Sequence, residues 1–374
     1  MTVAPLILLA AGGTGGHLFP AEALAAALTR RGLAVDLVTD SRAAKYAGHF
    51  PARELHVISA DTVRGRSPVA MAKTLFALGS GFVSALALLR RVKPAVVVGF
   101  GGYPTLPPLF AATVLGVPSL VHEANGVMGR ANRLLAKRVQ SIATGFPGIL
   151  DTNPALKAKA VWTGNPLRPA VLAATATPYA APTPDGTLNV LVFGGSQGAR
   201  VMSDVVPDGL AALDSGTRAR LRVVQQARAE DMARVQGTYA QAGIAAEVAP
   251  FFQDLPARMA GAHLVISRSG ASTVAELAAL GRPSLLVPLP GAIDQDQAAN
   301  AKALEAVGGA VTIPQAQFTP ERVAQEIRRL AATPETLTQM ADAARSAGVL
   351  DAADRLADVV ARLAGGAPAQ TQVG

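Results

Sequence analysis

A strand, a glycine-rich turn and a helix follow one another near the start of the chain and again in its second half. The run PLILLA leads into GGTGGH and a helix expected over about 20–30, and LNVLVF leads into GGSQGAR and a helix expected over about 201–213. Short apolar runs that alternate with helices are typical of parallel sheets covered on both faces. We therefore expect an α/β fold with two Rossmann-like, doubly wound parallel-sheet domains and a cleft between them.

A segment rich in Pro, Ala and Thr separates the two halves and indicates an interdomain linker over about 169–187. We expect an N-terminal domain over 1–163 and a C-terminal domain over 164–346. The last residues, 366–374, have the composition of a disordered tail.

The chain of 374 residues has a formal net charge of +8 and no cysteine. The missing thiols exclude disulfides, thiolate metal sites and cysteine nucleophiles. The positive charge favours an anionic partner, but no dense basic cluster interleaved with aromatic residues is present, so we expect no nucleic-acid partner. The N-terminus lacks the basic leader of a signal peptide.

The glycine loops are candidate phosphate-binding loops. GGTGGH fails the dinucleotide fingerprint because Leu18 stands where its last glycine would be, and no P-loop lysine follows. Glycines and a following helix N-terminus still suit an anion, although a tight turn without a ligand remains the alternative. With GGSQGAR and GFGGYP (99–104), three such loops suit substrates that carry several phosphates.

Two polar motifs in the second half have both a functional and a structural interpretation. In SRSGASTVAEL (267–277), a helix N-terminus with Glu276 could hold a diphosphate and a ribose, or Thr273 and Glu276 could simply cap the helix. In DQDQAAN (294–300), Asp294 and Asp296 lack a third hard ligand, so we expect no metal site.

The apolar stretch Ala70–Leu89 is long enough to span a bilayer, but polar residues and two glycines interrupt it. We expect a buried or surface-lying helix within 68–92 that docks a cytoplasmic protein on an anionic membrane. The residues predicted to dock are Lys73, Leu75, Phe76 and Phe82.

In order along the chain, these motifs resemble the MurG family over roughly residues 3–363. The motifs are GGTGGHLFPAEALA, GGYPTLP, HEANGVMGRAN, GNPLR, GGSQGAR, SRSGASTVAEL and the glutamines before Asn300. The resemblance implies an inverting GT-B glycosyltransferase of peptidoglycan synthesis, peripheral on the cytoplasmic face of the inner membrane. It would move N-acetylglucosamine from UDP-N-acetylglucosamine to the muramoyl 4-hydroxyl of lipid I and so make lipid II. Other cell-wall synthesis proteins are further expected partners.

The resemblance also implies site residues, and it implies that a C-terminal helix over 347–365 crosses back to the N-terminal domain. At the position of Phe252, an aliphatic residue is commoner in the family. Whether Gln295 or Gln297 contacts the sugar stays open. The implied donor-binding residues are Thr14, Gly15, Gly16, Asn125, Arg168, Ser196, Phe252, Ala271, Ser272, Thr273, Val274, Ala275, Glu276 and Gln297. The implied acceptor-diphosphate residues are Gly13, Gly101, Gly102, Tyr103, Gly195 and Gln197.

His17 is the first candidate for the base that deprotonates the acceptor, because imidazole titrates near neutral pH. Glu123 is the second candidate, and a histidine that only closes the glycine loop is the alternative. We expect no cofactor and no metal, since helix N-termini and Arg168 can stabilise the leaving diphosphate.

Three other functions fit parts of the sequence. The first is a UDP-N-acetylglucosamine 2-epimerase on the same fold, which needs no membrane-facing helix. The second is a nucleotide-sugar-binding module that depends on a partner for catalysis. The third, a dinucleotide oxidoreductase, rests only on Asp40 and the imperfect fingerprint.

Overall fold

The computed structural model describes residues 4–12, 15–41, 50–58, 68–195, 198–291 and 296–365, with the main chain alone over 68–77. The chain forms two compact units. Unit 1 comprises Met1–Arg168 and Leu350–Gly374, and unit 2 comprises Pro169–Val349. Each unit is described by itself below.

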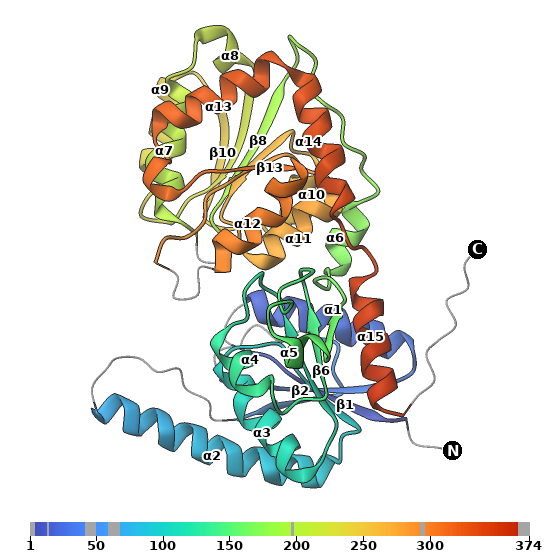
Figure 1. The fold of residues 1–374 in the computed structure, drawn as a ribbon. Helices are drawn as coiled ribbons and strands as arrows, with labels where there is room; N and C mark the ends of the chain where they lie inside the picture. The colour runs from blue at the N-terminus through green and yellow to red at the C-terminus, as the bar shows by residue number, and fades with distance from the viewer. Residues whose placement is uncertain are drawn as a thin grey trace, which may run out of the picture. The chain divides into compact units, whose positions relative to one another are not determined.

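Unit 1 is built on a seven-stranded sheet of order β3-β2-β1-β4-β5-β6-β7, in which all pairs of neighbours are parallel (Figure 1). The strands are β1 (Leu6–Ala10), β2 (Ala34–Thr39), β3 (Glu54–Val57), β4 (Val96–Gly99), β5 (Ser119–Glu123), β6 (Ser141–Thr144) and β7 (Ala160–Trp162). The helices are α1 (Gly15–Arg30), α2 (Pro68–Val92), η2 (Tyr103–Thr105), α3 (Leu106–Leu115), α4 (Arg130–Leu135), α5 (Pro154–Lys157) and α15 (Ala352–Leu363).

The central strand β1 shows why its sequence is apolar throughout. Alternate side chains of a strand point to opposite faces of the sheet. Ile7 and Leu9 pack in the core cluster that contains α1 and α15, whereas Leu8 and Ala10 pack in the cluster that contains α2 and α3. Both faces are therefore buried, and a polar residue has no place on either.

Helix α15 comes from the end of the chain and packs beside α1 (Figure 1). Leu356, Ala357 and Val360 are fully buried in the core cluster shared with α1. Arg31 adds ion pairs to Asp358 at 2.6 Å and to Asp354 at 3.3 Å. The C-terminal helix thus belongs to unit 1.

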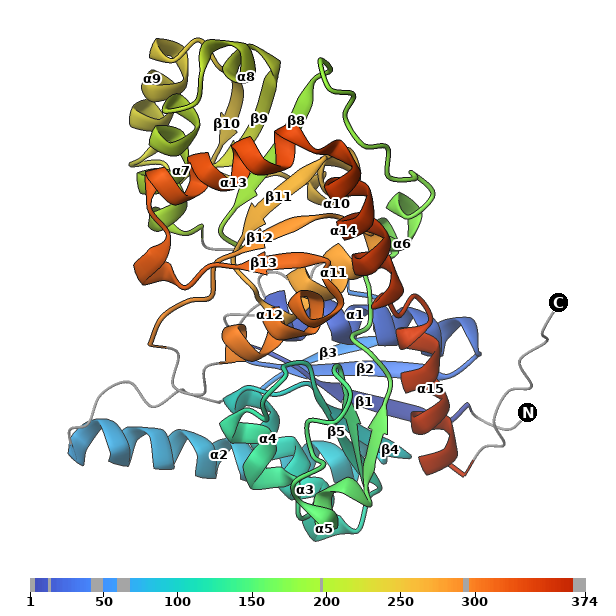
Figure 2. The ribbon, with the colours of Figure 1, turned by 45° about the horizontal axis from the view of Figure 1, so that its top comes forward.

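Unit 2 has a six-stranded parallel sheet of order β10-β9-β8-β11-β12-β13 (Figure 2). The strands are β8 (Leu188–Phe193), β9 (Leu221–Gln226), β10 (Ala245–Ala249), β11 (Leu264–Ser267), β12 (Ser284–Leu286) and β13 (Ala310–Thr312). The helices are α6 (Pro169–Ala174), α7 (Arg200–Ala211), α8 (Ser215–Arg220), α9 (Met232–Gln241), α10 (Leu255–Ala260), α11 (Ala271–Leu280), α12 (Asp296–Val307), η3 (Gln315–Gln317), α13 (Pro320–Ala332) and α14 (Pro334–Ser346).

The predicted fold class is confirmed, but the predicted start of the first helix is wrong. Helix α1 begins at Gly15 and carries Pro20 inside it. Proline is common at the first helical position, and for that reason it marked the start of the helix in the sequence. Within the helix it removes one backbone donor, the N–H that would bond to Gly16. His17 therefore lies in the first helical turn rather than in a loop.

The segment predicted as a linker packs on unit 2. Its first part is helix α6, which contacts α10 and α11. The fully buried Arg282 donates a hydrogen bond from Nη2 to the carbonyl oxygen of Thr177 at 3.0 Å. The Tyr179 hydroxyl donates to the carbonyl oxygen of His263 at 3.1 Å. The composition of this segment is that of a linker, but these contacts make it part of the second unit.

The residues before that segment belong to unit 1. The Asn165 side chain donates to the carbonyl oxygen of Ala124 at 2.9 Å, and the Arg168 guanidinium lies 4.4 Å from the centre of the Phe19 ring. The chain passes between the units at Arg168–Pro169 and again at Val349–Leu350. The first crossing lies a few residues beyond the predicted boundary at 163–164.

We predict that Leu356→Ala lowers the free energy of unfolding by about 2–5 kcal/mol, because a buried leucine leaves a cavity when it is truncated. Urea denaturation followed by circular dichroism measures the change. Arg362→Ala, at an exposed position of the same helix, serves as the control. An equal loss of stability in the two variants would show that α15 does not contribute to the core.

Candidate functional site

The candidate site in unit 1 lies at the carboxyl ends of its central strands. Parallel strands bring these ends to one edge of the sheet, which is where α/β proteins bind ligands. Gly12 follows β1, Gly101 and Gly102 follow β4, and Asn125 follows β5. The first turn of α1 begins at the same edge and carries His17.

The imidazole of His17 has one ring nitrogen engaged by the main chain. Nδ1 lies 3.2 Å from the carbonyl oxygen of Gly12. A carbonyl can only accept, so we assign the proton to Nδ1, and Nε2 keeps its lone pair. Burial lowers the pKa of His17, and the Gly12 carbonyl opposes this effect only in part. The ring is therefore neutral at pH 7, the form that a general base requires.

Two glycines pack against this ring. Gly101 and Gly102 have φ of +88° and +76°, a left-handed conformation that L-residues with side chains rarely adopt. A Cβ atom added at either position would lie 3.4 Å from an atom of the His17 ring. The glycine turn after β4 thus places the imidazole as well as bending the chain.

Glu123, the second candidate base, is surrounded by donors. Its carboxylate accepts four hydrogen bonds, from the main-chain N–H and side-chain amide of Asn125, the N–H of Gly129 and the amide of Asn132, at 2.8–3.3 Å. Burial raises the pKa of Glu123, and these four donors act in the opposite direction. The carboxylate holds the loop between β5 and α4, so the geometry favours His17 over Glu123 as the base.

His122 and Asn132 extend the buried network of unit 1 around Glu123. The Nε2 atom of His122 lies 3.2 Å from the carbonyl oxygen of Gly164. The Asn132 amide donates to the His122 carbonyl oxygen at 3.1 Å and to Glu123 at 2.8 Å. Asn132 was not predicted as a site residue, since nothing distinguishes it locally from other helical asparagines.

In unit 2 the predicted donor residues gather at the start of α11. Ala271, Ser272 and Thr273 form its first turn, and Glu276 is buried one turn further on. The N-cap is Gly270, which has no side chain, and Thr273 is the third residue of the helix, so the alternative in which Thr273 stands at the capping position is wrong. The first N–H groups of a helix have no intrahelical acceptor and suit an anion.

The glycine turn after β8 also requires its glycines. Gly195 has φ of +89°, and a Cβ atom at Gly194 would collide with Ala199. The N–H of Gly194 donates to the Gln226 side chain at 3.1 Å.

Several predicted site residues lie outside the described part of the chain, namely Gly13, Thr14, Ser196, Gln197 and Gln295. The predicted tail 366–374 also lies outside it.

Phe252 is 8% exposed and lies beneath a guanidinium. The Arg258 guanidinium carbon is 4.4 Å from the centre of the ring, and Arg258 also pairs with Asp254 and Glu247 at 2.7 and 2.6 Å. The ring is thus packed within unit 2. Phe252 would therefore contact the uracil of a bound nucleotide through its main chain.

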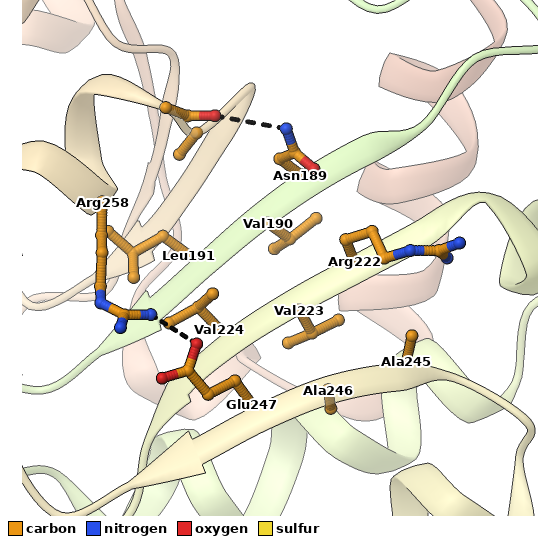
Figure 3. Close-up of a pocket in the computed structure, with 12 residues that line it drawn as sticks. Asn189, Val190, Leu191, Arg222, Val223, Val224, Ala245, Ala246, Glu247 and Arg258 are labelled. Carbon is orange, nitrogen blue, oxygen red and sulfur yellow. Dashed lines mark hydrogen bonds and ion pairs between the residues drawn. The ribbon is translucent and has the colours of Figure 1, made fainter.

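In unit 2, a groove of about 490 Å³ lies over the amino-terminal half of β8, β9 and β10 (Figure 3). Its lining runs from the starts of β8, β9 and β10, at Asn189, Arg222 and Ala245, to the middle of these strands, at Leu191, Val224 and Glu247. Ligands of parallel α/β sheets bind at the carboxyl ends of the strands. The groove therefore lies at the wrong end of the sheet to be the nucleotide site.

Among the described residues, one group has ligand atoms close enough to share a metal ion: Asp36, Glu54 and His56. Asp36 already accepts two hydrogen bonds from Arg53, at 2.9 and 3.0 Å, and faces His56 at 3.0 Å. The Arg53 charge opposes a cation there, so we interpret the group as an ion-pair cluster between β2 and β3. Of the acidic pair considered as a metal site in the sequence, Asp296 accepts a hydrogen bond from the N–H of Gln297 at 2.9 Å, and Asp294 lies outside the described residues.

Helix α2 occupies the segment predicted to dock on a membrane. Phe82 and Leu86 pack partly against the core of unit 1, whereas Val83 is 64% exposed. Phe82 is therefore only partly buried, and its predicted contact with the bilayer stays a prediction. The side chains of Lys73, Leu75 and Phe76 are outside the description. Within the described residues, none of the helices has the length and hydropathy that a membrane crossing requires.

Comparison with known proteins identifies the family. Residues 7–144 match the glycosyltransferase family 28 N-terminal domain, and residues 189–356 match the glycosyltransferase family 28 C-terminal domain. The chain belongs to glycosyltransferase family 28. The two matches together include residues of both units.

Two curated relatives carry the name UDP-N-acetylglucosamine–N-acetylmuramyl-(pentapeptide) pyrophosphoryl-undecaprenol N-acetylglucosamine transferase. One, from Rhodopseudomonas palustris (strain HaA2), is 62% identical over 364 residues, which cover 97% of this chain and all of the relative. Another, from Bradyrhizobium sp. (strain ORS 278), is 60% identical over 362 residues, which cover 97% of this chain and 99% of the relative. The resemblance to the MurG family is confirmed.

Solved structures agree with this family. The crystal structure of MurG from Acinetobacter baumannii is 30% identical, with a TM-score of 0.78 over 96% of this chain and 99% of that one. A putative UDP-N-acetylglucosamine 2-epimerase from Listeria monocytogenes has a TM-score of 0.69 at 14% identity, over 96% of each chain. The second likeness concerns the fold alone. The predicted GT-B fold is confirmed, and the epimerase alternative is not favoured.

We predict that the free energy of unfolding decreases as the pH falls from 6.5 towards 4, with His122 as one cause. Burial lowers the pKa of His122 from 6.5 to about 4. Between these values the unfolded chain binds a proton that the folded chain does not, so this residue lowers the stability by up to about 3 kcal/mol at the acid end.

Urea denaturation at a series of pH values measures this dependence. His122→Gln serves as the comparison, because its amide can still donate to the Gly164 carbonyl but does not titrate. The variant should show a shallower dependence on pH. Identical slopes in the two proteins would mean that His122 takes up its proton equally well in the folded chain.

Proposed function

We propose that the chain transfers N-acetylglucosamine from UDP-N-acetylglucosamine to the muramoyl 4-hydroxyl of lipid I, giving lipid II and UDP. Near-full-length relatives at about 60% identity carry the name of this transferase. The observation in the structure that carries the proposal is the imidazole of His17, whose Nδ1 lies 3.2 Å from the carbonyl oxygen of Gly12, which makes Nε2 the unprotonated ring nitrogen. An inverting transfer needs such a base, whereas a nucleotide-sugar-binding module does not.

Unit 2 holds the donor in this proposal. The diphosphate lies at the N-terminus of α11, whose N-cap residue Gly270 has no side chain, and the buried Glu276 accepts from the ribose hydroxyls. Backbone N–H groups at a helix end stabilise the charge that develops as UDP leaves. These groups and Arg168 take the part that a metal ion plays elsewhere, and transfer should therefore survive excess chelator.

Unit 1 supplies the base. The acceptor oxygen attacks the anomeric carbon as the bond from that carbon to the UDP oxygen breaks, which inverts the configuration. The proton of the 4-hydroxyl moves to Nε2 of His17, and UDP departs with the bonding electron pair. A neutral imidazole is needed at the outset, so the rate should fall on the acid side of neutrality.

The experiment that tests the proposal mixes the purified chain with UDP-N-acetylglucosamine and a short-chain lipid I analogue. The disaccharide product, detected by mass spectrometry with and without chelator, is the expected result. UDP binding without any product would favour the binding-module alternative. Conversion of the donor in the absence of acceptor would favour the epimerase alternative.

We predict that His17→Ala lowers turnover by about 100-fold or more, the range for loss of a general base, with UDP affinity nearly unchanged. His17→Asn is the matched variant, because its amide can replace the Nδ1–H donor to Gly12 but cannot accept a proton at neutral pH. Steady-state kinetics and calorimetry with UDP measure the two effects. If His17→Asn retains most of the activity, His17 is not the base and serves only to hold the Gly12 carbonyl.

We also propose that unit 1 docks on the cytoplasmic face of the membrane through α2, since a lipid-linked acceptor stays in the bilayer. Val83 is exposed, and Arg90 and Arg91 are exposed at the end of the helix. Each basic residue near an anionic surface contributes about 1 kcal/mol, which salt screens, whereas apolar insertion persists in salt.

Binding to anionic vesicles should therefore weaken with salt but not vanish. The double variant Phe76→Ser, Val83→Ser should bind less at every salt concentration, whereas Trp162→Ser, at an exposed apolar residue of β7, should not. Flotation of vesicles measures the bound fraction. A wild-type protein that stays unbound at low salt would contradict docking through α2.

A further inference from the structure

Arg268, directly after β11, has a buried guanidinium. The residue is 8% exposed. Nη1 donates to the carbonyl oxygens of Val287 and Pro288, both at 3.0 Å, and Nη2 donates to Oε1 of Gln315 at 2.6 Å. These acceptors are all neutral, although burial of a charge normally favours a carboxylate partner. The geometry suits a residue that fixes main-chain carbonyls in place.

The carbonyls that Arg268 holds immediately precede a residue that binds Gln297. The N–H of Leu289 donates to Oε1 of Gln297 at 3.0 Å. A main-chain N–H can only donate, so the amide oxygen must face Leu289 and the amide nitrogen must point away from it. Among the hydrogen bonds between described residues, none uses the two N–H donors of the Gln297 amide, which can therefore be offered to a ligand.

The main chain of Gln297 is held from the other side by the segment that follows Arg268. The Ser269 hydroxyl donates to the carbonyl oxygen of Gln297 at 2.8 Å. The Asn300 amide donates to the carbonyl oxygen of Ser269 at 3.2 Å. The bonds therefore close a ring from Arg268 through the 287–289 segment to Gln297 and back through Ser269.

From this ring we infer that Arg268 is a positioning residue: through the 287–289 segment it sets the orientation of the Gln297 amide, and with it the selectivity for the donor sugar. The inference rests on the proposed function, in which unit 2 holds a nucleotide sugar. An amide with fixed N–H donors bonds to hydroxyl oxygens in one arrangement and discriminates against an epimer. A loose amide can rotate and bond to either arrangement.

The test compares UDP-N-acetylglucosamine with its 4-epimer UDP-N-acetylgalactosamine in wild type and Arg268→Met. We expect the ratio of kcat/KM for the two donors to narrow by about 10-fold, within the range that one lost sugar contact produces. UDP affinity should stay within about 2-fold, because in this inference the Gln297 amide bonds to the sugar and not to the UDP part of the donor. The variant Gln315→Leu removes one of the three hydrogen bonds of the Arg268 guanidinium and should narrow the ratio by less than Arg268→Met does.

Arg282→Met is the matched control. Its guanidinium is also buried in unit 2 and donates to carbonyl oxygens, among them those of Met259 and Thr177. This control should lower the melting temperature without changing the ratio. In a Gln297→Met background, Arg268→Met should narrow the ratio no further, since the amide on which it acts is gone.

Three results would overturn the inference. The first is an unchanged ratio of kcat/KM for the two donors in Arg268→Met. The second is a loss of UDP affinity in Arg268→Met as large as the narrowing of that ratio, and the third is the same narrowing in Arg282→Met. Failure of the proposed function is recognised separately, because wild type would then form no disaccharide. In that case calorimetry with the two nucleotide sugars replaces kcat/KM and applies the same criteria to binding. Wild-type transfer with an unchanged ratio in Arg268→Met would contradict the inference alone.

Discussion

The parallel direction of the strands is the constraint on which the rest of the structure depends. All strand pairs in the described part of both sheets are parallel. The chain must therefore cross back after each strand, and the turns that follow the strands meet at one edge of each sheet. In unit 1 this edge collects Gly12, Gly101 and Glu123, and in unit 2 it collects Gly194 and Ser269.

Buried polar groups at these edges are held by neutral partners. Glu123 accepts from amides and main-chain N–H groups, and Arg268 donates to carbonyl and amide oxygens. A buried charge without such bonds would cost several kcal/mol, so the donors around Glu123 and the acceptors around Arg268 are what make the burial of these two charges tolerable. A hydrogen-bonded network has few alternative arrangements, and the ring that contains Arg268 and Ser269 can therefore hold the Gln297 amide in a fixed orientation.

The strands and glycine turns could be predicted because their causes are local. A strand buried on both faces, such as β1, is apolar along its whole length, and a turn such as Gly101–Gly102 needs residues without Cβ atoms. The start of α1 was misplaced because Pro20 resembles a helix start. The position of 169–187 on unit 2 and the function of Arg268 depend on partners far along the chain, and no periodicity or spacing reveals such partners.

The central claim is that unit 2 binds its nucleotide at the carboxyl ends of its strands, on the first turn of α11. A crystal structure of the chain with UDP tests this most directly. We expect a diphosphate bonded by main-chain N–H groups at Ala271–Thr273, with Glu276 accepting from the ribose. UDP in the groove lined by Asn189 and Arg222, with nothing at α11, would contradict it.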